Sequence, residues 1–178
     1  MLNKFSNGDL TDIMEKDLTK YDVIVRKKIG TSLMAADIKC VKINGERLIL
    51  KTFKKKYGKR FLRAMEIYFK CKDEDFLPKL RYYDTKHKIL ALSDVGEALE
   101  KWIPKHRKTF NKLRKKFNKE LKNMIDVFYD KYGYYHNDTQ NKNICIDKNN
   151  KIRMIDFEFS SNKMRKHNNG RNKKYFIL

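Results

Sequence analysis

Proline and glycine are scarce in this chain, with two prolines and seven glycines among 178 residues. So few chain-breaking residues leave little sequence that resembles a linker, which favours one compact domain. No run approaches the roughly 18 apolar residues that a membrane-spanning helix needs, and the N-terminal residues lack the apolar core of a secretory signal peptide. We therefore expect an intracellular, cytoplasmic protein without a membrane span.

Cysteine is also sparse and scattered. Cys40, Cys71 and Cys145 lie far apart, with no CxxC pair and no histidine at metal-ligand spacing. This pattern excludes a disulfide-rich secreted domain and gives no indication of a zinc site. Isolated cysteines in an odd number are typical of reduced thiols in a reducing compartment.

Acidic residues are outnumbered, with 22 Asp and Glu against 43 Lys and Arg, which leaves a formal net charge of +21. A positive field of this size attracts polyanions such as nucleotides, nucleic acid, anionic membranes or acidic proteins. An AT-rich coding sequence, which favours Lys and Asn, would explain the same excess without any function. The hydrophobic content of 40% and aromatic content of 12% predict a folded core.

The first half of the chain has the alternation of a β-sheet followed by one helix. Asn44-Gly45 lies between two β-prone runs and predicts a type I′ hairpin turn. A helix is predicted over residues 58–72, because apolar residues recur at helical spacing from Phe61 to Phe69. Five strands are expected, at residues 22–26, 38–43, 47–53, 79–83 and 88–92.

The second half of the chain is mainly helical. Its expected elements are a short helix over 97–103, a long helix over 109–132, and a β-hairpin of residues 144–146 and 152–155. Gly133 should end the long helix, whose face opposite the apolar one is rich in Lys and Arg. The order of elements indicates an α+β fold with two lobes and a ligand cleft between them.

Two acids and an amide surround the predicted hairpin. Asp138 lies in the loop after the long helix, Asn143 precedes the first hairpin strand, and Asp156 follows the second. Phosphoryl transfer needs a carboxylate that orients the attacking hydroxyl and oxygen ligands for Mg²⁺. Because the hairpin should bring Asn143 close to Asp156, this pattern indicates a phosphotransferase that uses ATP and Mg²⁺ as cofactors.

The spacing His136-x-Asp138-x-x-x-x-Asn143 resembles the catalytic loop of the protein-kinase-like superfamily, and residues 156–158 (Asp-Phe-Glu) resemble its metal-binding segment. The longer strings His-Asn-Asp-x-Gln-x-x-Asn and Ile-Asp-Phe-Glu-Phe-Ser-Ser-Asn are similar to those of the choline/ethanolamine kinase and aminoglycoside phosphotransferase branch. The resemblance covers about residues 21–160.

This resemblance implies a role for each matching residue. Asp138 would orient the acceptor hydroxyl, and His136 would brace the catalytic loop. Asn143 and Asp156 would hold the metal. Upstream, the apolar run ending at Lys51 resembles the kinase strand whose lysine holds the α- and β-phosphates.

The same resemblance implies that Glu66 positions Lys51 through an ion pair, and Glu66 is the only acid within residues 58–72. The phosphate-covering loop is less similar. Gly30 keeps the first glycine of G-x-G-x-x-G, while Ser32 and Ala35 stand at the other two positions. Backbone N–H groups at Gly30 and Ser32 are expected to approach the phosphates less freely than in an all-glycine loop. Residues 93–96 match the segment that binds the adenine edge.

Three departures from the kinase pattern bear on the acceptor. Asn137 stands where protein kinases usually have Arg, so control by activation-loop phosphorylation is not expected. Gln140 replaces the Lys common in Ser/Thr protein kinases, which favours the small-molecule branch. However, only 20 residues follow Glu158, so the helical half that builds a small-molecule acceptor pocket is not expected.

We therefore predict one kinase-like domain over residues 1–178, with ATP and Mg²⁺ bound between its lobes. Residues 21–93 would form a five-stranded N-lobe with one helix, residues 97–160 a truncated, mainly helical C-lobe, and residues 161–178 a basic tail. The first-choice acceptor is a Ser/Thr hydroxyl of a protein, and an acidic protein or a nucleic acid is a candidate partner of the basic surface. The alternatives are a small-molecule kinase of the choline or aminoglycoside type and a pseudokinase or basic binding protein on the same scaffold.

Overall fold

The computed structural model describes residues 13–19, 23–25 and 36–164. The chain divides into two compact units, one made of Met1–Phe61 and Lys79–Asp94, the other of Leu62–Pro78 and Val95–Leu178. Each unit contains its own sheet, and helices accompany them, which confirms the predicted α+β class. Within the described ranges, no helix has the length and apolar character needed to cross a bilayer.

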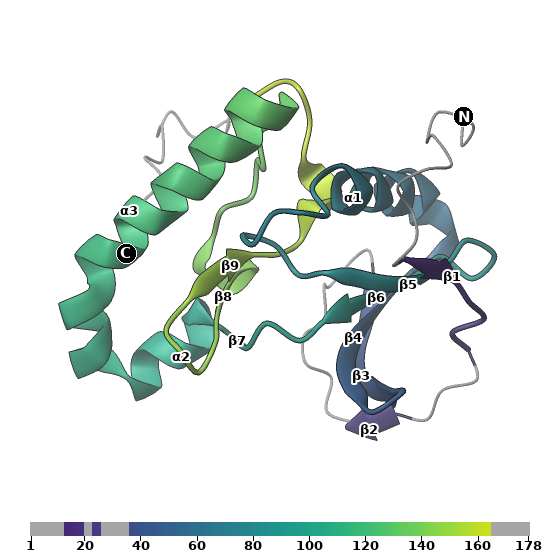
Figure 1. The fold of residues 1–178 in the computed structure, drawn as a ribbon, viewed down its shortest axis with the longest axis horizontal. Helices are drawn as coiled ribbons and strands as arrows, with labels where there is room; N and C mark the ends of the chain where they lie inside the picture. Colours follow the sequence, from purple (N-terminus) through teal and green to yellow (C-terminus); the bar gives the residue numbers. More distant parts are fainter. Residues whose placement is uncertain (1–12, 20–22, 26–35, 165–178) are drawn as a thin grey trace. The chain divides into compact units, whose positions relative to one another are not determined.

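The first unit contains a six-stranded sheet in the order β1-β5-β6-β4-β3-β2 (Figure 1). Its strands are β1 (Met14–Glu15), β2 (Val23–Val25), β3 (Ala36–Ile43), β4 (Glu46–Phe53), β5 (Leu80–Asp84) and β6 (Ile89–Ser93). Five of these strands match the predicted ones. The sixth strand, β1, was not predicted, because two residues are too few to show alternation in a sequence; it pairs in parallel with β5.

Local turn chemistry sets the register of the long β3–β4 hairpin. Asn44 and Gly45 both have positive φ, 49° and 82°, as the predicted type I′ turn requires. Ile43 then pairs with Glu46, and the pairing continues without a bulge to Ala36 and Phe53. One face of the sheet buries Leu18, Val41, Ile43, Leu48, Leu50, Tyr82, Ile89 and Ala91.

A buried carboxylate attaches the N-terminal segment to this sheet. Asp84 is 4% exposed and accepts hydrogen bonds from the backbone N–H groups of Leu18 (3.2 Å) and His87 (2.8 Å). Its Oδ2 also lies 2.8 Å from Nδ1 of His87. The ligand atoms of Asp17, Asp84 and His87 lie within 4.8 Å of one another; Asp84 and His87 are hydrogen-bonded to each other, and Asp17 accepts from the backbone N–H and the hydroxyl of Thr19. Burial opposes ionisation of Asp84, but the hydrogen bonds from His87 and Leu18 outweigh it and lower the carboxyl pKa.

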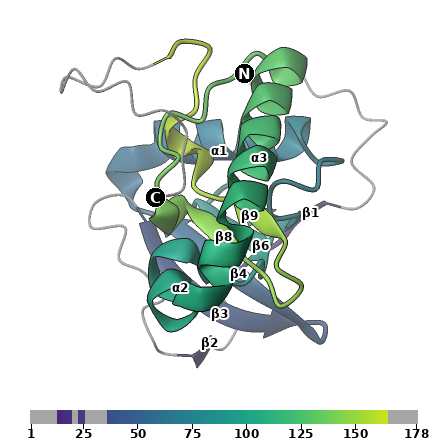
Figure 2. The same ribbon diagram turned by 90° about the vertical axis from the view of Figure 1, so that its left-hand side faces the viewer.

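The second unit combines helices with a three-stranded sheet in the order β7-β8-β9. Its elements are most of α1 (Gly58–Lys70), then β7 (Glu97–Ala98), α2 (Leu99–Lys105), α3 (Arg107–Tyr132), β8 (Ile144–Ile146) and β9 (Ile152–Met154). Short 3-10 helices are η1 (Lys55–Tyr57), which lies in the first unit, η2 (Asn141–Asn143) and η3 (Phe157–Phe159). Figure 2 shows α3 running beside β8 and β9, and α3 packs against β9.

Two sequence predictions in this unit are corrected. The helix expected from residue 97 begins at Leu99, because Glu97 and Ala98 pair with β8 as the third strand of the sheet. The helix also continues past Pro104 to Lys105. Near the end of a seven-residue helix a proline removes only one backbone hydrogen bond, so it is tolerated there.

The long helix α3 is anchored by its apolar face and ends where the sequence predicts. Phe117, Leu121 and Phe128 on this face are at most 1% exposed. Gly133 adopts the left-handed conformation with φ 69°, and its N–H donates to the carbonyl of Tyr129 at 2.7 Å. This cap sets the direction in which the chain leaves α3 towards the loop at residue 136.

Gly96 provides a test of the packing between β7 and β8. Its φ is +100°, and an added Cβ would overlap the carbonyl group of Ile146, whose carbon would lie 2.7 Å away. Gly133, with φ +69°, has open space around the equivalent position. We expect Gly133→Ala to cost about 1–2 kcal/mol through its backbone conformation alone, and Gly96→Ala to cost at least about 3 kcal/mol. Chemical denaturation of the two variants beside wild type measures this, and equal costs would contradict it.

Candidate active site

The loop between α3 and β8 and the segment after β9 lie together in the second unit. The first carries His136, Asp138 and Asn143, and the second carries Asp156. The two segments are joined at Ile155, whose backbone N–H donates to the carbonyl of Asn143 at 2.9 Å. The carbonyl of Ile155 lies 2.9 Å from Nε2 of His136. Both polar groups of a single residue therefore connect the predicted catalytic loop to the predicted metal-binding segment.

His136 is buried, and both of its ring nitrogens lie within hydrogen-bond distance of backbone groups. The side chain is 2% exposed. Because a carbonyl can only accept, Nε2 carries the proton and donates to Ile155, while Nδ1 accepts from the N–H of Asp138 at 3.3 Å. The ring also packs on the buried Phe157, with centroids 4.7 Å apart. The ring therefore links the carbonyl of Ile155 to the N–H of Asp138, which is the arrangement expected of a side chain that braces this loop.

Asn143 fixes the orientation of Asp138. The Asn143 side chain is 3% exposed, and its amide nitrogen donates to the backbone carbonyl of Asp138 at 2.9 Å and to its Oδ2 at 2.8 Å. The other carboxylate oxygen of Asp138 accepts from Nε2 of Gln140 at 2.7 Å. Two amides thus hold the carboxylate, which remains half-buried at the surface of the loop. A carboxylate so held can accept a proton from a hydroxyl that reaches it.

Asp156 adopts a backbone conformation that is uncommon for a residue with a side chain. Its φ and ψ are 69° and 56°, in the left-handed region. Such conformations cluster at functional sites, where the surrounding structure compensates their cost. Here the next residue, Phe157, is fully buried and packs at 5.4 Å against Phe128 of α3 and at 5.7 Å against Tyr68 of α1. The anchor of Phe157 on one side and the hydrogen bond from Ile155 to Asn143 on the other fix the backbone of the segment that carries Asp156.

The donor set at this point suits a hard divalent cation. Since the amide nitrogen of Asn143 is directed at Asp138, the carbonyl oxygen of the same side chain is the atom left for a ligand. Asp156 follows Ile155, which is hydrogen-bonded to Asn143. Mg²⁺ prefers carboxylate and amide oxygens. The residues therefore fit the metal that the sequence pattern implies.

Asn137 has a role that the sequence did not reveal. It has φ 62°, and its side-chain nitrogen donates to Oγ of Ser161 at 2.9 Å and to the carbonyls of Phe159 (3.3 Å) and Lys163 (3.2 Å). Where protein kinases place an arginine, this asparagine binds the chain that follows η3. Tyr135 adds a backbone bridge to Ser161. These contacts fix the segment after Asp156 without a phosphate group.

Glu66 lies on α1 within the second unit and belongs to a hydrogen-bonded cluster. Its carboxylate accepts from the Tyr134 hydroxyl at 2.6 Å and from Nη1 of Arg63 at 2.8 Å, and Nζ of Lys70 lies 3.1 Å away. Lys70 also donates to the Tyr134 hydroxyl at 2.7 Å. Tyr134 comes two residues before His136, so this cluster attaches α1 to the start of the catalytic loop. Sequence reasoning missed Tyr134, because a hydroxyl in a run of tyrosines carries no recognisable pattern.

Lys51 lies in β4 of the first unit. Its register partners are Ile38 and Leu90, its side chain is 7% exposed, and its Nζ is 5.1 Å from the centroid of the Phe53 ring. A lysine buried on a strand is not the solvated edge residue that such a position usually holds. The expected ion pair between Lys51, in the first unit, and Glu66, in the second, stays a prediction. Gly30 and Ser32 lie outside the described residues.

The Glu66 cluster generates a prediction about pH. Burial raises the pKa of Glu66, but the hydrogen bonds from Tyr134 and Lys70 and the charge of Arg63 outweigh it, so the pKa lies below the ordinary 4.5. A lowered pKa stabilises the fold above pH 4.5, and this contribution is lost as pH falls through the folded-state value.

We expect Tyr134→Phe to raise the Glu66 pKa, because it removes one hydrogen-bond donor to the carboxylate. The difference in unfolding free energy between the variant and wild type should therefore shrink as the pH falls below 4.5. NMR titration of the Glu66 side-chain carboxyl measures the pKa. Tyr129→Phe, at an exposed tyrosine, is the matched control. An unchanged Glu66 pKa in Tyr134→Phe would contradict the role given to this hydroxyl.

Comparison with known proteins bears on the same residues. A family model described as choline/ethanolamine kinase matches residues 1–170. The match includes Lys51, Glu66 and the whole loop from His136 to Asp156, and it confirms the relationship to the protein-kinase-like superfamily. A search of curated proteins gives no match. For the acceptor, the family supports the small-molecule alternative better than the protein hydroxyl predicted first.

Proposed function

This chain belongs to the choline/ethanolamine kinase family and is a kinase that transfers phosphate to a hydroxyl group, and we propose that its acceptor is a small molecule. The proposed class is an amino alcohol of the choline or ethanolamine type or an aminoglycoside. Protein Ser/Thr hydroxyls, the first expectation from sequence, receive no support from the family. Gln140, which stands where Ser/Thr protein kinases have Lys, favours the same choice.

The family match carries the choice of acceptor, and the observation behind the proposed chemistry is the fixed orientation of the Asp138 carboxylate. Amide groups of Asn143 and Gln140 bind one oxygen each, at 2.8 and 2.7 Å. We assign Asp138 to orient the acceptor hydroxyl and take up its proton. The hydroxyl oxygen then forms a bond to the γ-phosphorus of ATP, while the bond to the β-phosphate oxygen breaks and ADP leaves. Positioning of this kind supplies much of the rate in phosphoryl transfer.

The nucleotide and metal assignments are part of the proposal. Asn143 and Asp156 would hold Mg²⁺, which when bound neutralises charge on the phosphates. Lys51 would bind the α- and β-phosphates, and backbone N–H groups at Gly30 and Ser32 would approach them from the glycine-poor loop. The buried position of Lys51 supports this role, because a lysine enclosed on a strand is not an ordinary solvated surface residue.

A non-catalytic role on the same scaffold is the alternative. The Lys51, Glu66, Asp138, Asn143 and Asp156 set is complete in the sequence. The His136 brace and the amide contacts of Asp138 are also in place. A binding protein would not need the carboxylate to be held at both oxygens, so these contacts favour catalysis.

The first test concerns Asp138. We expect Asp138→Asn to lower kcat by about 10²–10⁴-fold, because the amide cannot take up the proton of the acceptor. Affinity for ATP should change by less than about twofold, since Asp138 is not itself assigned to the metal or the phosphates and the side-chain oxygen of Asn can still accept from the Asn143 amide. Asp130→Asn, on the exposed end of α3, is the matched control and should behave as wild type. A near-wild-type rate for Asp138→Asn would remove this residue from the mechanism.

The second test identifies the acceptor. The purified protein is incubated with Mg²⁺ and γ-labelled ATP together with choline, ethanolamine, an aminoglycoside or a cell extract, beside the Asp156→Ala variant. We expect label on one of the small molecules and none with Asp156→Ala. Asp73→Ala, at an exposed acid of the second unit, should keep full activity. Label on a protein band instead would restore the protein acceptor, and Mg²⁺-dependent ATP binding without any transfer would indicate a pseudokinase.

A further inference from the structure

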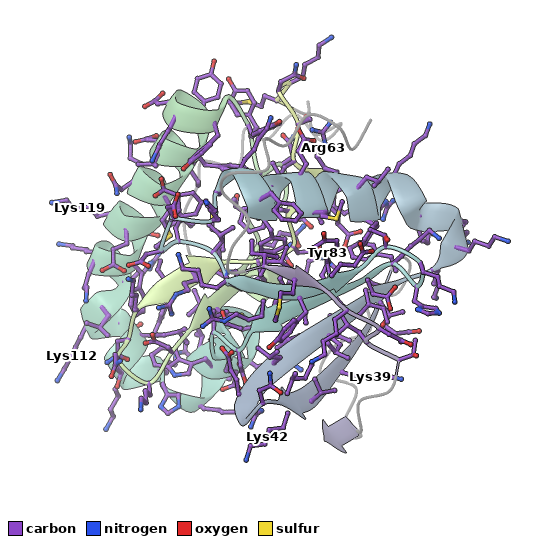
Figure 3. The ribbon with its side chains drawn as sticks, turned by 45° about the vertical axis from the view of Figure 1, so that its right-hand side comes forward. Lys39, Lys42, Arg63, Tyr83, Lys112 and Lys119 are labelled. Carbon is purple, nitrogen blue, oxygen red and sulfur yellow. The ribbon has the colours of Figure 1, made fainter. Side chains whose placement is uncertain are left out.

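The N-terminal half of α3 presents a row of lysines that the proposed reaction does not use. The row, here called the lysine stripe, consists of Lys108, Lys112, Lys115 and Lys119. All four are exposed, and Figure 3 shows Lys112 and Lys119 extending from the same side of α3. At a rise of about 1.5 Å per residue the stripe is about 17 Å long, with one cation about every 5–6 Å.

The stripe is exclusively cationic. No acidic residue occurs between Glu100 and Glu120. Lys116 and Lys122, beside the stripe, pair with Glu120 and Asp126, whereas none of the four stripe lysines forms an ion pair with residues in the described ranges. The opposite face of the helix packs into the core of the unit, where Phe110 and Phe117 are buried. The stripe therefore offers an anionic partner positive charge, but no apolar side chains that could insert into that partner.

Polar and aromatic groups flank the stripe. Asn111, Arg114, Lys115 and Asn118 line a shallow hollow along one side of it. At the corner between α2 and α3, the exposed His106 stacks on Trp102 with centroids 4.7 Å apart. Trp102 is itself fixed edge-on against the buried Phe117 at 6.4 Å. The corner thus offers one face of an immobilised aromatic ring next to Lys108.

We propose that the lysine stripe and the His106 corner bind single-stranded nucleic acid. The lysines would contact successive phosphates, the ring of His106 would stack on a base, and the amides of Asn111 and Asn118 would hydrogen-bond phosphate or base edges. A bilayer surface offers charge but no stacking partner for His106, and α3 has no apolar face left to enter it. The proposal does not depend on the acceptor of the kinase reaction.

The experiment measures binding of a fluorescein-labelled oligouridylate of about 20 nucleotides by anisotropy over a range of salt concentrations. The test variant changes the four stripe lysines to Gln, which has a similar helix propensity. The matched control changes four scattered exposed lysines, Lys42, Lys59, Lys86 and Lys148, to Gln and so removes the same total charge. Circular dichroism checks that both variants keep their helices.

We expect the stripe variant to lose at least about 10-fold in affinity at about 0.1 M salt, and the control less than about twofold. The slope of log K against log salt should fall in magnitude by about 0.7 for each lysine that contacts a phosphate. Equal losses in the two variants would overturn the proposal, because they would show only an effect of net charge.

His106→Ala separates nucleic acid from other polyanions. It should weaken oligouridylate binding without changing the salt slope, and it should leave binding of inorganic polyphosphate unchanged. Equal binding of oligouridylate and a duplex of the same length would overturn the single-strand assignment. Vesicles with anionic lipid that bind through the stripe while oligouridylate does not would assign this surface to a membrane and overturn the proposal.

Discussion

The candidate site depends on the two hydrogen bonds of the Ile155 backbone. Its N–H binds the carbonyl of Asn143 and its carbonyl binds His136, each at 2.9 Å. They connect the segment after β9 to the two loop residues that contact Asp138, because both Asn143 and His136 also hydrogen-bond to Asp138. The contacts of Asn137 and Tyr135 with the chain after η3 join the same two segments further along. A backbone interaction of this kind places no demand on the side chain, so it leaves no trace in the sequence.

A second set of contacts extends this arrangement to α1. Glu66 binds Tyr134, and Tyr68 packs on Phe157, so α1 contacts the predicted catalytic loop at its start and the predicted metal-binding segment at its anchor. Burial raises the pKa of Tyr68 far above its ordinary value, and the charge of Asp156 raises it further. Tyr68 therefore stays neutral beside the acid. The proposed ion pair with Lys51 would involve the Glu66 carboxylate, which already has three partners in its own unit.

The sequence predicted elements and residue types better than it predicted contacts. Asn44-Gly45 and Gly133 set their turns through local conformation, so the β3–β4 hairpin and the end of α3 were predictable. The two-residue strands β1 and β7 were not, because long-range pairing decides them. The spacing of His136, Asp138, Asn143 and Asp156 indicated the site, since side-chain chemistry carries that signal. The protein hydroxyl was ranked first among the acceptors because only 20 residues follow Glu158. The number of residues does not show which acceptor the side chains bind.

Ion pairing separates the lysine stripe from the other cations of α3. The half of the helix after the stripe contains Glu120, Asp126 and Asp130, and Lys122 pairs with Asp126 there, whereas the four stripe lysines form no ion pair within the described ranges. Opposite charges at close range largely cancel each other's field, so a paired lysine attracts a distant anion less than an unpaired one. The uncompensated charge of α3 is therefore concentrated in the stripe, which is why a docking role fits this half of the helix better than the other.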